Sequence, residues 1–217
     1  MWGVNKLKYT KDTLDAEAYC LPFVKQWASD ITGNKCWLDI IPIPNYEPSS
    51  LDSANKIYKF LQTRHVDVIL DYGARKPAYI DFKGTYGVNG IEWYQKLTMT
   101  LYYRDRSEAD TVHHKSYPFL SNAFPDNTQY ILYASKLLMI LIPKHSLNKV
   151  MTSNKYKSRF DPSNIEWKQD KSDKTGRQLI KNIVFDLDNK ADMTLLAEAG
   201  ALFYGLRGDK YVRLAPI

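Results

Sequence analysis

The chain is poor in cysteine and contains no long apolar run. Only two of its 217 residues are cysteines, Cys20 and Cys36, and they have neither disulfide-framework nor zinc-finger spacing. We expect both to be reduced and buried, as in a cytosolic protein. No apolar run reaches the roughly 18 residues of a membrane-spanning helix. The N-terminus lacks the apolar centre of a signal peptide. We therefore expect a cytoplasmic protein without a membrane partner.

Several motifs of catalysis and ligand binding are also absent. The chain has no serine or cysteine nucleophile motif and no glycine-rich phosphate loop. His113 and His114 have no second cluster at metal-ligand spacing, so we interpret them as loop residues. The acidic cluster Asp186–Asp192 lacks the glycine and terminal glutamate of a calcium loop. We interpret it as a helix cap.

Basic charge is abundant in one region. The net charge is +6, and residues 144–181 hold ten Lys and Arg against four Asp and Glu, which accounts for all of it. A region of this kind favours a polyanionic partner such as nucleic acid; the alternative is a solvated basic surface without a partner. The cations that we expect to bind the phosphate backbone are Lys144, Lys149, Lys155, Lys157, Arg159, Lys168, Lys171, Lys174 and Arg177.

The most informative stretch lies between Val66 and Gly84, and its pattern predicts two strands joined by a turn. Asp81 and Lys83 are two positions apart on the second strand, so they share a face. Asp67, on the first strand, is expected to lie alongside. Two carboxylates and an ammonium are costly to bury without a partner, and a divalent metal would satisfy them. Asp71 is an alternative to Asp67, and a surface ion pair is an alternative role for Asp81 and Lys83.

The rest of the chain predicts a mixed α/β sheet with helices on its faces. We expect an α/β core over residues 1–143 and a basic C-terminal α+β extension over residues 144–217 that packs on this core or continues it. An irregular loop or lid is expected over Arg104–Thr128. The predicted helices are Asp12–Ile31, Ser53–Thr63 (with Ile57, Phe60 and Leu61 inward), Ile91–Tyr103, His145–Ser153 and Lys190–Ala199. The other predicted strands are Cys36–Ile43, Tyr130–Ala134, Leu137–Pro143, Asn164–Gln169, Gln178–Leu187, Leu202–Leu206 and Tyr211–Leu214.

Between residues 12 and 103 the chain resembles the PD-(D/E)XK, or restriction-endonuclease-like, nuclease superfamily. The first half of the motif is Val66-Asp67-Val68-Ile69-Leu70, and the second is Ile80-Asp81-Phe82-Lys83. Glu17 falls on a predicted helix where that family often carries an acid, and Gln95 follows on another. Lys83-Gly84 followed by an aromatic residue is also similar to phage junction-resolving members.

This resemblance implies a restriction-endonuclease-like mixed central sheet and an Mg²⁺- or Mn²⁺-dependent phosphodiester hydrolase, most readily of DNA. Asp67, Asp81, Glu17 and the carbonyl of Phe82 would be metal ligands, because Mg²⁺ prefers oxygen donors. Lys83 would hold the attacking water or stabilise transition-state charge. Glu17 and Gln95 are also readable as surface residues.

The expected partner is therefore nucleic acid, and a homodimer is left open. The alternatives are a non-catalytic nucleic-acid-binding or phage-encoded interaction protein on a degenerate nuclease fold, and a module that binds an acidic partner.

Overall fold

The computed structural model describes residues 21–28, 39–42, 52–62, 66–71, 77–84, 86–87, 90–91, 96–115, 128–134, 138–171 and 173–215. The chain forms two compact units. The first comprises Met1–Tyr94, Asn127–Ile142 and Ala201–Pro216; the second comprises Gln95–Asp126 and Pro143–Gly200, with Ile217. The predicted boundary after residue 143 lies close to one of the points where the chain changes unit. The predicted extension 144–217, however, contributes to both units.

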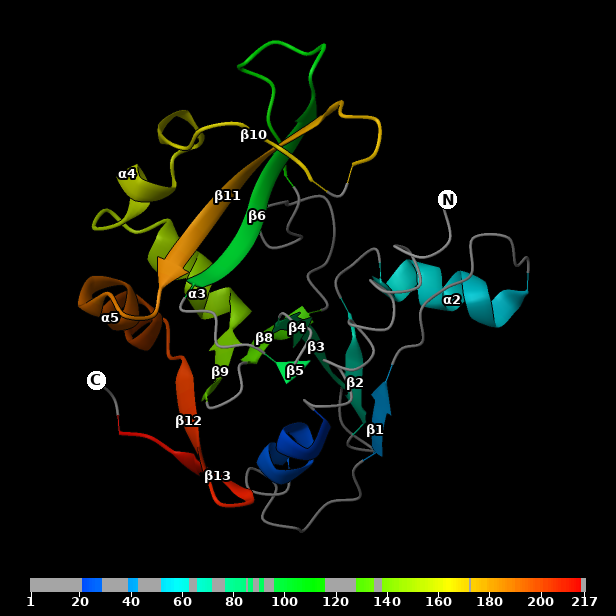
Figure 1. The fold of residues 1–217 in the computed structure, drawn as a ribbon, viewed down its shortest axis with the longest axis vertical. Coiled ribbons are helices and arrows are strands. Elements are labelled where there is room, and N and C mark those ends of the chain that lie inside the picture. Colours follow the sequence, from blue (N-terminus) through cyan, green and yellow to red (C-terminus); the bar gives the residue numbers. More distant parts are fainter. Residues whose placement is uncertain are drawn as a thin grey trace. The chain divides into compact units, whose positions relative to one another are not determined.

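A seven-stranded mixed sheet forms the first unit, in the order β1-β2-β3-β8-β9-β12-β13. The β1–β2, β2–β3, β9–β12 and β12–β13 pairs are antiparallel, whereas β3 and β8 are parallel. A parallel pair needs a crossover connection, and here the chain passes through the second unit between β3 and β8. The strands are β1 (Asp39–Pro42), β2 (Val68–Asp71), β3 (Ala78–Gly84), β8 (Thr128–Ala134), β9 (Leu138–Pro143), β12 (Leu202–Arg207) and β13 (Lys210–Arg213) (Figure 1).

A helix at residues 21–28 packs on one face of this sheet. It buries Phe23, Val24 and Trp27 against alternate side chains of β2 and β3, such as Leu70 and Ile80. The ring of Phe23 meets those of Tyr204 and Tyr211 edge-on, with centroids 5.0 and 5.2 Å apart. Because strand side chains alternate between faces, the residues between the buried ones point to the other side of the sheet.

Helix α2 (Ser53–Gln62) forms where the sequence predicts it, but its apolar face is at the surface. Ile57 is 57% exposed and Phe60 49% exposed, whereas Asn55 is buried. The predicted inward direction of Ile57 and Phe60 is therefore wrong. A helical spacing predicts which side chains share a face, not whether another element covers that face. The remaining elements of this unit are the short strands β4 (Tyr86–Gly87) and β5 (Gly90–Ile91).

The second unit contains a four-stranded antiparallel sheet, in the order β10-β11-β6-β7. Side chains of helices α3 and α4 pack on one face of it: Phe160 lies 6.1 Å from Phe185, ring centroid to ring centroid, and Met151 lines a cavity with Leu101. The elements are β6 (Lys96–Asp105), β7 (His114–Lys115), α3 (Lys144–Met151), α4 (Lys157–Phe160), the 3₁₀ turn η2 (Pro162–Asn164), β10 (Lys168–Gln169), β11 (Gln178–Asp186) and α5 (Lys190–Glu198) (Figure 1).

The predicted helix over Ile91–Tyr103 is wrong, because most of this stretch is strand β6. Burial alternates from exposed Lys96 through buried Leu97, exposed Thr98 and buried Met99, the period of a strand with one buried face. β6 pairs along its length with β11, from Lys96↔Asp186 to Asp105↔Gln178. Leu101 is the extra residue at a register shift opposite Lys181 and Asn182, a β-bulge. The predicted loop from Arg104 also starts too early, since β6 continues to Asp105 and β7 follows.

Candidate metal centre and nucleic-acid interface

Asp67, Asp81 and Lys83 lie at the same end of the β2–β3 pair. The register aligns Val68 with Ile80, so Asp67 immediately precedes the paired segment of β2, and Asp81 immediately follows it on β3. The amide of Asp67 still donates to the carbonyl of Ile80 at 2.9 Å. The strands therefore hold the two acidic residues next to each other, as the sequence predicts.

The carboxylate of Asp67 reaches across to the neighbouring strand. Its Oδ2 accepts a hydrogen bond from the backbone N–H of Phe82 at 2.6 Å. The side chain of Phe82 packs on the hydrophobic cluster beneath the sheet, which holds this part of β3 in place. Asp67 is thereby fixed beside the main chain that directly follows Asp81.

Asp81 is a buried carboxylate with only one oxygen paired. Its residue exposure is 1%. Oδ1 accepts from the ammonium of Lys83 at 2.6 Å, and the side chain of Lys83 is 27% exposed. Oδ2 is buried without a hydrogen-bond partner. Buried polar atoms are rarely left unsatisfied in folded proteins. An unsatisfied carboxylate oxygen beside a second carboxylate is therefore a position where a cation would be stabilised.

The neighbours of this site on strand β8 are buried. Because Ile80 and Phe82 contact the cluster around helix 21–28, Asp81 and Lys83 point to the opposite face. Their partners on the parallel strand β8 are Ile131 and Tyr133, which are 0% and 4% exposed. Low polarity around charged groups strengthens the electrostatic interaction of a carboxylate pair with a cation.

The structure separates Asp67 from the alternative, Asp71. Asp71 is the last residue of β2, and its partner in the register is Asp39 on the edge strand β1. It lies four strand residues beyond Asp67, which corresponds to about 13 Å. Asp71 is thus at the opposite end of the β2–β3 ladder from Asp81 and Lys83. Asp67 is the first acidic residue of the candidate site.

The oxygen donors at this site fit Mg²⁺. Carboxylates of Asp67 and Asp81 and the main-chain carbonyl of Phe82 are the hard oxygen ligands that this ion prefers. Among the described residues, no three His, Cys, Asp or Glu side chains come together as a metal-binding group. The other two predicted site residues, Glu17 and Gln95, lie outside the described residues.

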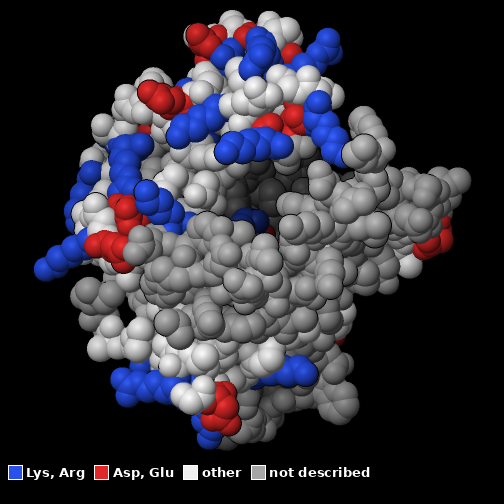
Figure 2. Space-filling view, viewed as in Figure 1, with Lys and Arg blue, Asp and Glu red and all other residues white. Residues whose placement is uncertain are grey.

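Eight of the nine predicted phosphate-binding cations are exposed, and one is not. Lys144 is 0% exposed, so its ammonium does not reach a phosphate on the surface. It is the first residue of α3 and directly follows the buried strand β9, which explains why it is enclosed. On the face drawn in Figure 2, the Lys and Arg side chains of the described residues are interspersed with Asp and Glu. The exposed residues are Lys149, Lys155, Lys157, Arg159, Lys168, Lys171, Lys174 and Arg177.

Two of these exposed cations are held by acidic side chains. Lys155 lies 2.5 Å from Glu198, and this hydrogen bond raises the pKa of the lysine. Arg159 lies 2.5 Å from the buried carboxylate of Asp192. Burial acts to raise the pKa of Asp192, but hydrogen bonds from Arg159 and the amide of Asp186 lower it overall. Both cations therefore also have a structural role in this unit.

The structure contains a cation–aromatic cluster around Trp167 that the sequence did not predict. The guanidinium carbon of Arg104 lies 4.6 Å from the Trp167 ring centroid, and the ammonium of Lys181 lies 4.7 Å from it. His113 stacks on the same ring at 5.1 Å. Burial and the charge of Arg104 lower the pKa of Lys181. These residues come from three separate segments, so no spacing in the sequence brings them together. Trp167 shields two buried cations here. His113 lies in a loop, as predicted, whereas the same prediction for His114 is wrong, because His114 begins strand β7.

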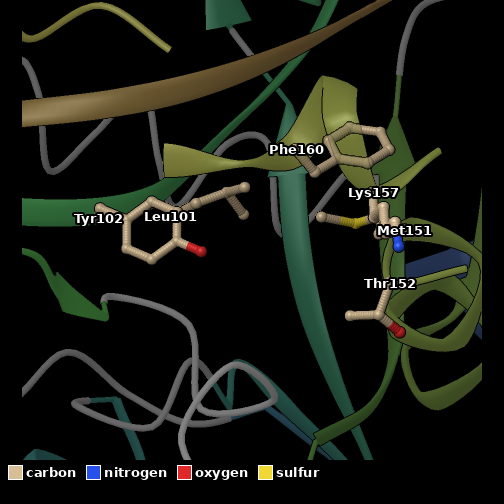
Figure 3. A pocket seen from close by; sticks show the side chains of 6 residues that line it. All are labelled: Leu101, Tyr102, Met151, Thr152, Lys157 and Phe160. Atoms are coloured by element: carbon tan, nitrogen blue, oxygen red, sulfur yellow. The ribbon is translucent and has the colours of Figure 1, made fainter. Parts of the chain in front are cut away.

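A cavity of about 280 Å³ opens in the second unit between β6, α3 and α4. Apolar side chains of Leu101, Met151 and Phe160 line it, together with Tyr102, Thr152 and Lys157, as Figure 3 shows. Burial raises the pKa of Tyr102, and the charge of Asp161 adds to this effect. The volume of the cavity is just below the range of typical small-molecule sites.

Comparisons with family models, curated proteins and solved structures found no match to this chain. In the part of the chain that the structure describes, no helix is long and apolar enough to cross a bilayer.

Proposed function

We propose that this protein is a metal-dependent nuclease that hydrolyses phosphodiester bonds in DNA. The observation that carries the proposal is the buried Asp81 carboxylate, which has Lys83 on one oxygen and no hydrogen-bond partner on the other. Asp67 is held next to it by Phe82. The resemblance of the two strands to the PD-(D/E)XK motif adds support from the sequence.

Each residue has a role that follows from its position. Asp67 and Asp81, with the carbonyl of Phe82, would hold Mg²⁺ or Mn²⁺. A bound ion of this kind neutralises phosphate charge and acidifies water. Lys83 is partly exposed and oriented by Asp81, so its ammonium is placed to stabilise negative charge that develops on a phosphate beside the site. The exposed basic residues of the second unit would bind the phosphate backbone without reading its sequence.

The decisive assay is cleavage of supercoiled plasmid and of single-stranded DNA in Mg²⁺ or Mn²⁺. We expect wild type to cut, and we expect Asp81→Asn and Lys83→Ala each to lose at least about 100-fold in rate, the scale of losing a transition-state stabilising group. Asp71→Asn is the matched control, because it changes the same residue type on the same hairpin at the far end. Equal cutting by wild type and Asp81→Asn would reject the assignment.

The second candidate function is non-catalytic nucleic-acid binding. It is favoured by the eight exposed cations of the second unit, which can bind phosphates without any metal site. DNA retention that falls with salt, without cutting in any metal, would support this function and exclude the nuclease.

A further inference from the structure

One face of the four-stranded sheet in the second unit carries no helix contact among those described above. Side chains directly opposite each other on antiparallel strands share a face. The register aligns His114 with Tyr103, Tyr103 with Ile180, and Ile180 with Lys168. One row of side chains therefore crosses all four strands over about 14 Å, three strand spacings. We call this row, together with Val184, the outer face.

The outer face is accessible and partly aromatic. Tyr103 and Val184 are each 39% exposed, and the side chain of His114 is 47% exposed. The rings of Tyr103 and His114 lie 5.4 Å apart at an angle of 31°. The two rings are therefore in contact across adjacent strands. Buried alternate residues such as Leu97 and Ile183 belong to the opposite face, where α3 and α4 pack.

The aromatic pair is held in place before any ligand binds. His114 Nε2 lies 2.9 Å from Oε1 of Glu108, and Oε2 of Glu108 accepts from the amide of Asp105 at 2.8 Å. Further along, Thr100 donates to Asn182 at 2.8 Å across the two central strands. A preorganised surface loses less conformational entropy on binding.

Several cations lie at one end of the outer face. Lys168 belongs to the row, and the β10–β11 connection carries Lys171, Lys174 and Arg177.

Two acidic residues nearby accept hydrogen bonds within the protein, and these bonds lower their pKa, so both remain ionised. Asp173 accepts from the amides of Thr175, Arg177 and Gln178, and Asp105 accepts from both donors of Ser107. Exposed aromatic rings beside cations are the features that bind single-stranded nucleic acid, because bases stack on the rings while cations follow the phosphates.

We infer that the outer face binds single-stranded nucleic acid, with a base stacked on Tyr103 and phosphates next to Lys168 and the β10–β11 connection. Duplex is disfavoured on such a surface, because paired bases are already stacked on each other. The inference deepens the proposed function by naming the substrate form, and it rests on a surface of the second unit rather than on Asp67, Asp81 and Lys83.

The test is fluorescence anisotropy of the full chain with labelled oligothymidine, oligouridine and duplex DNA, each of about twelve nucleotides or base pairs, the scale of single-strand sites. EDTA is present so that no cleavage occurs. Wild type should bind the single strands more tightly than the duplex. Tyr103→Ala should weaken single-strand binding by about 5-fold to 100-fold, the effect of losing one base stack. Tyr103→Phe should bind like wild type, since the ring is retained.

Tyr156→Ala is the matched control, because Tyr156 lies before α4 with Lys155 over its ring and not in the outer-face row. Unchanged single-strand binding by Tyr103→Ala, an equal loss in Tyr156→Ala, or preferential binding of duplex would each overturn the inference. Binding that depends on Tyr103 in a protein that never cuts DNA would keep the outer face and reject the nuclease. Cutting that depends on Asp81, with binding indifferent to Tyr103, would do the reverse.

Discussion

The Asp81 site predicts a metal-dependent change in stability that requires no catalytic assay. An ion that binds only the folded state stabilises it by RT ln(1 + [L]/Kd). At a free Mg²⁺ concentration ten times the dissociation constant this is about 1.4 kcal/mol, which raises the Tm of a chain of this size by about 3–6 °C. We expect this rise for wild type between EDTA and about 10 mM Mg²⁺, for a dissociation constant near 1 mM.

Asp81→Asn is the informative variant. It removes one of the two carboxylates and should abolish the Mg²⁺-dependent rise. In EDTA its Tm should stay within about 3 °C of wild type, because the isosteric amide keeps an oxygen that can accept from Lys83 and removes the cost of burying a charge. The ammonium of Lys83 loses the charge of Asp81 but has access to water, since its side chain is 27% exposed.

Differential scanning fluorimetry of wild type, Asp81→Asn and Asp71→Asn measures these differences. Asp71→Asn should respond to Mg²⁺ like wild type, since Asp71 lies at the other end of β2. An equal Mg²⁺ response in Asp81→Asn would show that the ion binds elsewhere. A Tm more than about 10 °C lower in EDTA would show that the Asp81 carboxylate is structural. Either result would refute the reasoning.

Two further predictions concern the fold. Phe23→Ala should lower the free energy of unfolding in urea by about 3–5 kcal/mol, because Phe23 is 1% exposed where helix 21–28 packs on the sheet. Ile57→Ala, at a 57% exposed position, should change this free energy by less than about 0.5 kcal/mol. Similar losses in the two variants would contradict the assigned core. Hydrogen bonds from Gln178 and Thr175 lower the pKa of Asp173 to about 2, so its contribution to stability should be complete above about pH 4 and lost as the pH falls towards 2. The Tm difference between wild type and Asp173→Asn should therefore shrink steadily as the pH falls from about 4 to about 2, and a difference that stays constant over this range would show that the carboxylate charge is not its source.

Much of the local structure was predictable because it depends on neighbouring residues. The stretch Ala78–Lys83 and the apolar run Leu137–Pro143 both predict strands, which are confirmed as β3 and β9. The predicted hairpin of Leu202–Leu206 and Tyr211–Leu214 is confirmed as β12–β13. Its turn contains Gly208 with a φ of 64°, a backbone conformation that glycine adopts readily. The two-residue step from Asp81 to Lys83 was likewise enough to place both on one face.

The features that the sequence did not predict depend on how strands pair and how side chains are buried. Lys96–Asp105 is a strand because β11, some eighty residues later, pairs with it, and helical spacing alone does not reveal that partner. The register of β2 against β3 selects Asp67 over Asp71. Lys144 is buried and so is not part of the basic surface. A count of charged residues in the sequence does not reveal this.

The sequence by itself therefore determined the mixed α/β class, most of the strands and the Asp81–Lys83 pair, because these follow from the periodicity of adjacent residues. Only the tertiary structure decided which aspartate lies beside that pair, that one oxygen of Asp81 is buried without a partner, and that His114, Tyr103, Ile180 and Lys168 form one row. These features depend on strand register and on burial, which are set by packing and pairing between strands and not by the periodicity of one stretch.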